Sequence, residues 1–233
     1  MSSPALAHLA ARVSPSRWPS PRAALRRLVW PALVWAARHR PYLQLAARAA
    51  EVEGDVIECG VFRGRSLLRM ACRFQELAPR KAVFGLDSFD GFPANAVTQL
   101  DLNHERTIRQ LEGKFRRAGR LIGHIERIAA DLDLDVHLRP GPFAETLPAL
   151  AATRRFAFAH LDCDLYSSYR TCLAQLYPAM SPGGIILFDE YRSSLWPGAR
   201  RAIDEFLADK PERPERCADP GRPHAKYFIV KQG

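Results

Sequence analysis

The feature that most constrains this chain is the stretch Asp55–Ser66, which reads DVIECGVFRGRS. A short apolar run ends at an acidic residue, Glu58, and two glycines, Gly60 and Gly64, then bracket a tight turn before a helical pattern begins at Ser66. Glycine lets the backbone approach a ligand closely, and the free N–H groups at the start of a helix favour an anion. We therefore expect a buried strand that leads through a glycine loop into the N-terminus of a helix.

A second acidic strand end supports the same interpretation. The apolar run Ala82–Asp87 (AVFGLD) finishes at Asp87, and folds of this kind use an acidic residue at this place to hold the two hydroxyls of a ribose. The first half of the chain is therefore expected to bind a nucleoside.

Short apolar runs alternate with helical patterns along the chain. The runs lie at 55–58, 82–87, 135–141, 156–162 and 185–189, and the helical patterns at 67–77, 166–180 and 200–207. This alternation predicts an α/β fold with a Rossmann-like, doubly wound, mostly parallel sheet. A last run at 224–231, paired with one near 215–217, is expected to add an antiparallel C-terminal strand. Ligands of such sheets bind beyond the carboxyl ends of the strands.

Charge divides the chain into two parts. Residues 1–50 contain eight arginines and no acidic residue, so the net charge of +9 belongs to this segment, and the rest is close to neutral. We expect one domain at 51–233, preceded by helices at 23–51 that pack on it or cover its cleft, and a loosely ordered tail at 1–21. A long insertion at 94–131 is expected to form substrate walls.

Composition excludes several classes of function. The near-neutral body argues against a nucleic-acid partner, and the chain lacks the Asn/Asp-Pro-Pro-aromatic tetrapeptide of amino-methylating enzymes. No stretch approaches the roughly 20 apolar residues that span a bilayer. The five cysteines have no C-x-x-C spacing, which favours reduced thiols in a cytoplasmic protein. A homo-oligomer remains compatible with the sequence.

Acidic residues gather at the carboxyl ends of the predicted strands: Glu58, Asp87, Asp162, Asp164, Asp189 and Glu190. Either Asp162 or Asp164, together with the Asp189–Glu190 pair, could converge on a hard divalent cation such as Mg²⁺. The alternative is that these acids cap the helices that follow them. We place the ligand role first for Asp162 and Asp189 and leave the two roles equal for Asp164. His160 is expected to be a core histidine with satisfied hydrogen bonds.

The wider set of motifs resembles the macrocin O-methyltransferase family, whose members are S-adenosylmethionine-dependent enzymes that methylate sugar hydroxyls of natural products. The likeness extends from about Asp55 to Leu207, and its motifs keep the family's order. They are Ile57–Ser66, Phe84–Pro93, His160–Ser168, Leu176–Pro178, Ser181–Gly184 and Phe188–Tyr191. The glycine loop also resembles that of catechol-type O-methyltransferases.

The resemblance implies a role for each matching residue in cofactor binding. Glu58 would accept from the methionine ammonium, and Ser66 would bind the carboxylate. Gly60 and Gly64, with Phe62 between them, would let the backbone pass close to the cofactor. The remaining implied cofactor residues are Asp87, Ser88 and Phe89 at the ribose and Gly141 and Phe143 near the adenine. The metal ligands would be Asp162, Asp189 and Glu190, with Asp164 as the competing candidate.

Two departures from these families affect the chemistry. The macrocin family usually has Asp-Asp where this chain has Asp189-Glu190, and the lysine base of catechol-type enzymes corresponds to Leu165. Asp162 and Asp164 are therefore the candidates for taking the proton of the acceptor hydroxyl. In this hypothesis Mg²⁺ lowers the pKa of that hydroxyl and holds it in line with the sulfonium methyl.

Two other functions remain as alternatives. A nucleotide-dependent oxidoreductase is one, although Gly60-x-x-x-Gly64 lacks the G-x-G-x-x-G spacing of the dinucleotide fingerprint. A non-catalytic relative that binds a partner through its basic N-terminal segment is the other. The sequence carries no motif that identifies the acceptor.

Overall fold

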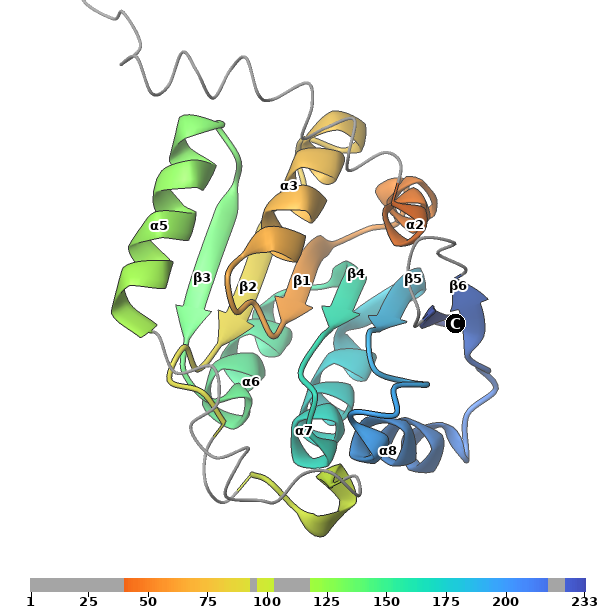
Figure 1. Cartoon of the computed structure of the whole chain (residues 1–233). Coiled ribbons are helices and arrows are strands. Elements are labelled where there is room, and N and C mark those ends of the chain that lie inside the picture. Colours follow the sequence, from red (N-terminus) through yellow and green to blue (C-terminus); the bar gives the residue numbers. More distant parts are fainter. Residues whose placement is uncertain (1–39, 93–95, 103–117, 218–224) are drawn as a thin grey trace, which may run out of the picture.

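A computed structural model describes residues 40–92, 96–102, 118–217 and 225–233 of the chain. These residues form a seven-stranded sheet in the order β3-β2-β1-β4-β5-β7-β6 (Figure 1). The strands are β1 (Asp55–Cys59), β2 (Val83–Asp87), β3 (Val136–Pro140), β4 (Phe156–Leu161), β5 (Met180–Phe188), β6 (Glu215–Cys217) and β7 (Lys226–Val230). The pairings from β3 to β5 are parallel, whereas β7 is antiparallel to both β5 and β6. The predicted fold class is thus confirmed.

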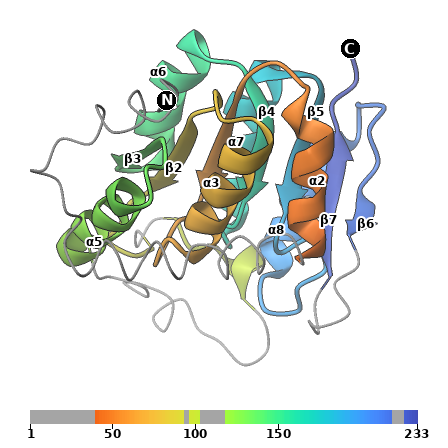
Figure 2. The ribbon, with the colours of Figure 1, turned by 90° about the horizontal axis from the view of Figure 1, so that it is seen from above.

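Helices cover both faces of the sheet (Figures 1 and 2). One face carries α2 (Pro41–Ala50), α3 (Arg65–Leu77) and α5 (Ala118–Asp131), and the other carries α6 (Phe143–Thr153), α7 (Tyr166–Leu176) and α8 (Pro197–Leu207). Two short 3₁₀ turns, η3 (Gln99–Asp101) and η4 (Tyr177–Ala179), complete the described elements.

The apolar strands form two core layers because successive side chains of a strand point to opposite faces. Along β5, Ile185 and Leu187 pack beneath α2 and α3, while Ile186 and Phe188 pack beneath α7 and α8. All six residues of β4 are buried. Continuous apolar runs are typical of parallel strands that are covered on both faces, as observed here.

The strand order places the ligand crevice. The chain leaves β1 towards β2 and β3 on one side, and β4 and β5 continue on the other, so the order reverses between β1 and β4. Doubly wound sheets bind ligands outside the carboxyl ends of the strands at such a switch point. The glycine loop follows β1, and Asp162 follows β4, so both predicted groups lie at this place.

One sequence prediction near β5 is wrong, and one helix after β3 was missed. The helix predicted over 166–180 ends at Leu176, and β5 already begins at Met180, so Ser181–Gly184 lies within a strand. Its pairing with β4 shifts register across this proline and glycine stretch, as bulged strands allow. Helix α6 was not predicted, because Pro148 lies inside it and interior proline ordinarily argues against a helix.

The structure describes part of the N-terminal segment and part of the 94–131 insertion. Helix α2 lies within the 23–51 segment and packs on the domain, with Leu43 and Ala46 fully buried. The predictions for residues 1–39 lie outside the described residues. Of the insertion 94–131, helix α5 covers the sheet through its fully buried Ile125.

The cysteines and the lengths of the helices can be compared with the expectations from composition. All five cysteines are buried and free of disulfides. None of the helices described in the structure is long and apolar enough to cross a membrane.

Candidate functional site

A cavity of about 600 Å³ lies at the carboxyl ends of the central strands. All the residues expected at the cofactor line it except Glu58 and Gly64, and Asp162 and Asp164 line it as well. The structure therefore gathers residues from five separate stretches of the sequence around one space. The loops after β1, β2, β3 and β4 supply most of this lining, and Leu121 of α5 adds to it.

Asp87 ties the glycine loop to the end of β2. Its Oδ2 accepts hydrogen bonds from the backbone N–H groups of Val61 (2.9 Å) and Phe62 (2.8 Å), and its Oδ1 accepts one from Phe89 (2.7 Å). Asp87 also lines the cavity. Its expected contact with a ribose remains a prediction, and the structure adds a second role, which is to fix the loop that follows β1.

The glycines of the loop are required by the packing of the protein itself. Gly60 has φ of 94°, and a Cβ there would overlap the backbone oxygen of Asp162. Gly64, the residue before α3, has φ of 72°, and a Cβ would lie 2.6 Å from the Ile125 side chain. Both residues therefore need the left-handed conformation and the missing side chain. Gly60 brings the ends of β1 and β4 together, and Gly64 lets α5 pack closely against the loop.

Three residues with side chains adopt positive φ at the cavity: Phe62 (47°), Phe89 (53°) and Asp164 (60°). This conformation is costly for residues other than glycine and persists where surrounding contacts impose it. Such residues concentrate at ligand sites, so their position agrees with a binding role for the cavity.

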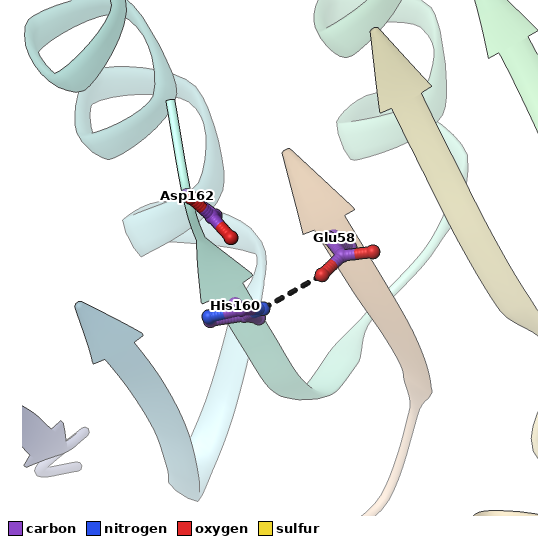
Figure 3. Close-up of side chains that lie close together, drawn as sticks. All are labelled: Glu58, His160 and Asp162. Carbon is purple, nitrogen blue, oxygen red and sulfur yellow. Dashed lines mark hydrogen bonds and ion pairs between the residues drawn. The ribbon is translucent and has the colours of Figure 1, made fainter. Parts of the chain in front are cut away.

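Glu58 and His160 form a buried hydrogen bond beside the cavity. His160 Nδ1 lies 2.8 Å from Glu58 Oε1, and both side chains are fully buried (Figure 3). The other carboxylate oxygen, Oε2, has no hydrogen-bond partner within the protein. A buried acceptor without a donor is costly, so this oxygen suits a cationic group of a ligand. His160 has partners at both ring nitrogens, as expected for a satisfied core histidine.

Three carboxylates converge where β4 and β5 end. Asp162, Asp164 and Glu190 each offer an oxygen within 4.8 Å of the others. Burial raises the pKa of Glu190 well above its ordinary value, and the neighbouring Asp162 and Asp164 carboxylates raise it further. A hard divalent cation between the three would oppose the repulsion among them, and carboxylate oxygens are the donors that Mg²⁺ prefers. The residues present therefore fit such an ion.

Asp189 is held apart from this cluster. Its Oδ1 forms an ion pair with Lys226 of β7 and lies 3.5 Å from His160 Nε2. The structure thus brings Asp164, rather than Asp189, together with Asp162 and Glu190. Sequence reasoning missed Lys226 because the last strand lies far from the acidic residues in the chain and carries no motif.

Sequence reasoning also missed the residues that hold or line the site from α7. Ser167, Ser168 and Thr171 line the cavity with hydroxyl groups from the first turns of this helix. Tyr169 donates a hydrogen bond of 2.5 Å to Glu190 Oε2. The signal available for the serines was their place directly after the Asp162–Asp164 turn, within a motif already noted. Tyr169 carried no comparable signal because its partner, Glu190, lies in the turn after β5, 21 residues further along the chain.

Comparisons with known proteins agree on one family. The family model described as macrocin O-methyltransferase (TylF) matches residues 42–213. The chain is 34% identical over 148 residues to 8-demethyl-8-(2,3-dimethoxy-alpha-L-rhamnosyl)-tetracenomycin-C 4'-O-methyltransferase of Streptomyces olivaceus. The match covers 60% of this chain and 54% of that protein. It is 31% identical over 159 residues to demethyldecarbamoylnovobiocin O-methyltransferase of Streptomyces niveus. This match covers 67% of this chain and 59% of that protein.

A third relative and two solved structures are also similar. Mycinamicin III 3''-O-methyltransferase of Micromonospora griseorubida is 30% identical over 163 residues, covering 66% of this chain and 61% of that protein. The chain thus spans a little over half the length of the curated relatives it matches. The calicheamicin methyltransferase CalS11 has a TM-score of 0.70 at 24% identity, with 99% of this chain and 94% of that chain covered.

The O-methyltransferase NovP has a TM-score of 0.65 at 24% identity, with 88% of this chain and 79% of that chain covered. At this level of identity the two structures show a shared fold. The family model covers the glycine loop, the three carboxylates and the helices that hold them. On this match the chain belongs to the macrocin O-methyltransferase family.

Proposed function

We propose that the protein is an S-adenosylmethionine-dependent O-methyltransferase, assisted by a divalent cation, that acts on a hydroxyl of a sugar or glycosylated natural product. One observation carries the proposal: a single cavity joins the glycine loop and the Asp162–Asp164 turn. A methyl donor on the loop would therefore face a carboxylate-rich turn across the same space. The names of the relatives, which are O-methyltransferases of glycosylated natural products, support the choice of acceptor.

The residues on the loop side would bind the methyl donor. Ser66 and the start of α3 would bind the methionine carboxylate, because helix N-termini favour anions. Glu58 Oε2, which lacks a partner in the protein, would accept from the methionine ammonium. Asp87 and Ser88 would face the ribose, while Gly141 and Phe143, which also line the cavity, would lie near the adenine.

The residues on the opposite side would bind and deprotonate the acceptor. Asp162, Asp164 and Glu190 would hold the cation, with Asp189 as the ligand that sequence reasoning favours in place of Asp164. When bound, the sulfonium supplies the methyl group and the cation lowers the pKa of the acceptor hydroxyl. A carboxylate of the Asp162–Asp164 turn would take the proton of that hydroxyl. We infer a cytoplasmic location and a small-molecule acceptor, with no nucleic-acid partner.

Calorimetry and a transfer assay test this function. The protein should bind S-adenosylhomocysteine and not NAD, and labelled S-adenosylmethionine should transfer its methyl group to one of a panel of sugar-bearing metabolites. Asp162→Asn should abolish turnover and leave the affinity for S-adenosylhomocysteine nearly unchanged. Binding of NAD in place of S-adenosylhomocysteine would favour an oxidoreductase, and binding of neither would refute the proposal.

A further inference from the structure

A buried chain of polar contacts links β7 to β1, the strand that leads into the glycine loop. Lys226 in β7 is only 5% exposed, and its Nζ lies 3.2 Å from Nε2 of His160. His160 in turn lies 2.8 Å from Glu58 through Nδ1 (Figure 3). The three residues come from β7, β4 and β1, so only the folded sheet brings them together.

The two neighbours of His160, the Glu58 carboxylate at Nδ1 and the Lys226 ammonium at Nε2, agree on which ring nitrogen carries the proton. An ammonium group can only donate hydrogen bonds, so Nε2 of His160 must accept from Lys226. A neutral imidazole with an accepting Nε2 carries its proton on Nδ1. His160 therefore donates from Nδ1 to Glu58 Oε1, which leaves Glu58 Oε2 as the free acceptor.

We propose that Lys226 is a positioning residue for the methyl donor, which acts through His160 to present Glu58 Oε2 to the ammonium of the bound aminoacyl nucleoside. This inference rests on the proposed function. Without Lys226, Nε2 of His160 loses its donor and faces the carboxylate of Asp189, whose Oδ1 lies 3.5 Å away and favours a proton on Nε2. Nδ1 would then turn a lone pair towards Glu58 Oε1, and the repulsion would displace the carboxylate.

The surroundings of Lys226 keep this arrangement fixed. Lys226 forms an ion pair with Asp189, and its Nζ lies 5.0 Å from the centre of the Tyr42 ring. The same ring stacks on His160 with centroids 6.0 Å apart and an angle of 22°. Tyr42 belongs to α2, so the helix before the first strand covers the network. Lys226 itself lies beyond residues 42–213, the part matched by the family model.

A metal ion is a weaker interpretation of the same residues. Glu58, His160 and Asp162 each offer an atom within 4.8 Å of the others, which is close enough to hold a metal. A metal would need a lone pair of the imidazole, yet Nδ1 faces Glu58 and Nε2 faces Lys226. The nearby ammonium would also repel a cation. The contacts therefore favour a hydrogen-bond relay.

Two nucleosides, one with and one without the amino-acid group, distinguish a specific role of Lys226 in positioning Glu58 from a general destabilisation of the protein. S-adenosylhomocysteine carries the amino-acid part with its ammonium, whereas 5′-methylthioadenosine lacks it. Lys226→Met should weaken the calorimetric affinity for S-adenosylhomocysteine about tenfold, the size expected for a hydrogen bond to a charged group, and leave that for 5′-methylthioadenosine within about twofold. Equal losses for both ligands, or no loss for either, would overturn the proposal.

Lys81→Met is the matched control. Lys81 is half-buried, and it donates to the backbone oxygens of Val52 and Gly54 (2.7 Å to Gly54), which precede β1 at the end of the strand opposite the cavity. We expect Lys81→Met to leave the ratio of the affinity for S-adenosylhomocysteine to that for 5′-methylthioadenosine as it is in the wild-type protein. A ratio that falls equally in both lysine variants would contradict a specific role for Lys226.

A double-mutant cycle tests whether Lys226 acts through His160. In His160→Asn, the side-chain amide can donate to Glu58 without help from Lys226. Adding Lys226→Met to that variant should then cause no further loss of S-adenosylhomocysteine affinity, and additive losses would overturn the relay.

A measurement on the wild-type protein keeps the proposal testable even where a variant fails to fold. Long-range ¹H–¹⁵N NMR, with the signal assigned by triple-resonance spectra of the wild-type protein, should show His160 as the Nδ1–H tautomer. An Nε2–H tautomer would refute the relay. Wild-type protein that binds neither nucleoside would instead refute the proposed function, so the two failures are distinguishable.

Discussion

Asp101 caps a helix that begins 65 residues later in the chain, because its Oδ1 accepts a hydrogen bond of 2.6 Å from the backbone N–H of Tyr166. Its Oδ2 accepts from both the backbone N–H and the hydroxyl of Thr98, at 2.8 Å each. Asp101 is fully buried, and α7 has no side-chain cap at its own Leu165. Helix α7 starts directly after the Asp162–Asp164 turn, so a distant segment helps to hold the turn.

Asp101→Asn should lower the free energy of unfolding by about 1–2 kcal/mol, because an amide can serve as acceptor on one side only and loses either the cap or the Thr98 contacts. Gly198→Ala should act in the same direction, since a Cβ there would overlap Asp101 Oδ1. Urea denaturation measures both effects. Asp209→Asn, the same change at an exposed site, should stay within about 0.5 kcal/mol of wild type. An Asp101→Asn variant as stable as wild type would contradict the capping role.

Tyr169→Phe should weaken the binding of Mn²⁺, used as a probe for the divalent cation, on the order of tenfold. The hydroxyl of Tyr169 fixes Glu190 through a bond of 2.5 Å, and phenylalanine keeps the ring but removes this bond. Titration followed by electron paramagnetic resonance measures the affinity. Tyr177→Phe is the control, because the Tyr177 hydroxyl lies 2.9 Å from both oxygens of Glu212 and away from the cavity lining. Equal effects of the two variants would count against positioning of Glu190.

Asp164→Asn should weaken Mn²⁺ binding more than Asp189→Asn. Asp164 already faces Asp162 and Glu190, whereas Asp189 is paired with Lys226 and would have to leave that partner. The same titration applies, with S-adenosylhomocysteine affinity as the check that the fold is intact. A larger loss in Asp189→Asn would show that the ion recruits Asp189, as sequence reasoning expects. Removing metal with EDTA should abolish methyl transfer, and undiminished activity would refute a metal-assisted reaction.

Glu212→Gln should destabilise the protein at neutral pH by about 1–2 kcal/mol, and the difference from wild type should narrow as the pH falls below 4.5. Burial alone would raise the pKa of Glu212, but hydrogen bonds from the backbone and from Tyr177 outweigh it and hold the pKa below 4.5. A carboxyl group whose pKa is lower in the folded state than in the unfolded state contributes its full stabilisation when the pH is above its pKa in the unfolded state. This contribution is lost as the pH falls through its pKa in the folded state. Urea denaturation at several pH values checks the trend. A difference that widens towards acid would contradict it.

The sequence predicted the parts of the fold that depend on local pattern. The acidic residues Glu58, Asp87 and Asp162 were predicted from apolar runs that finish in an acid. The structure places Asp87 and Asp162 in the cavity lining and Glu58 buried beside it. Local pattern failed at β5 and α6, where proline and glycine sit inside regular elements. Proline and glycine weaken such elements, and there the packing of the surrounding sheet and helices decides the conformation.

For this protein, the sequence alone determined the alternation of strands and helices apart from α6, the glycine loop, and the set of acidic residues available to a site, because each depends on neighbours along the chain. Only the tertiary structure decided how those residues pair. It joined Asp101 to Tyr166, Tyr169 to Glu190, and Lys226 to both Asp189 and His160. The physical reason is that hydrogen bonds and ion pairs depend on distances of a few ångströms, which sequence separation does not fix until the sheet has formed.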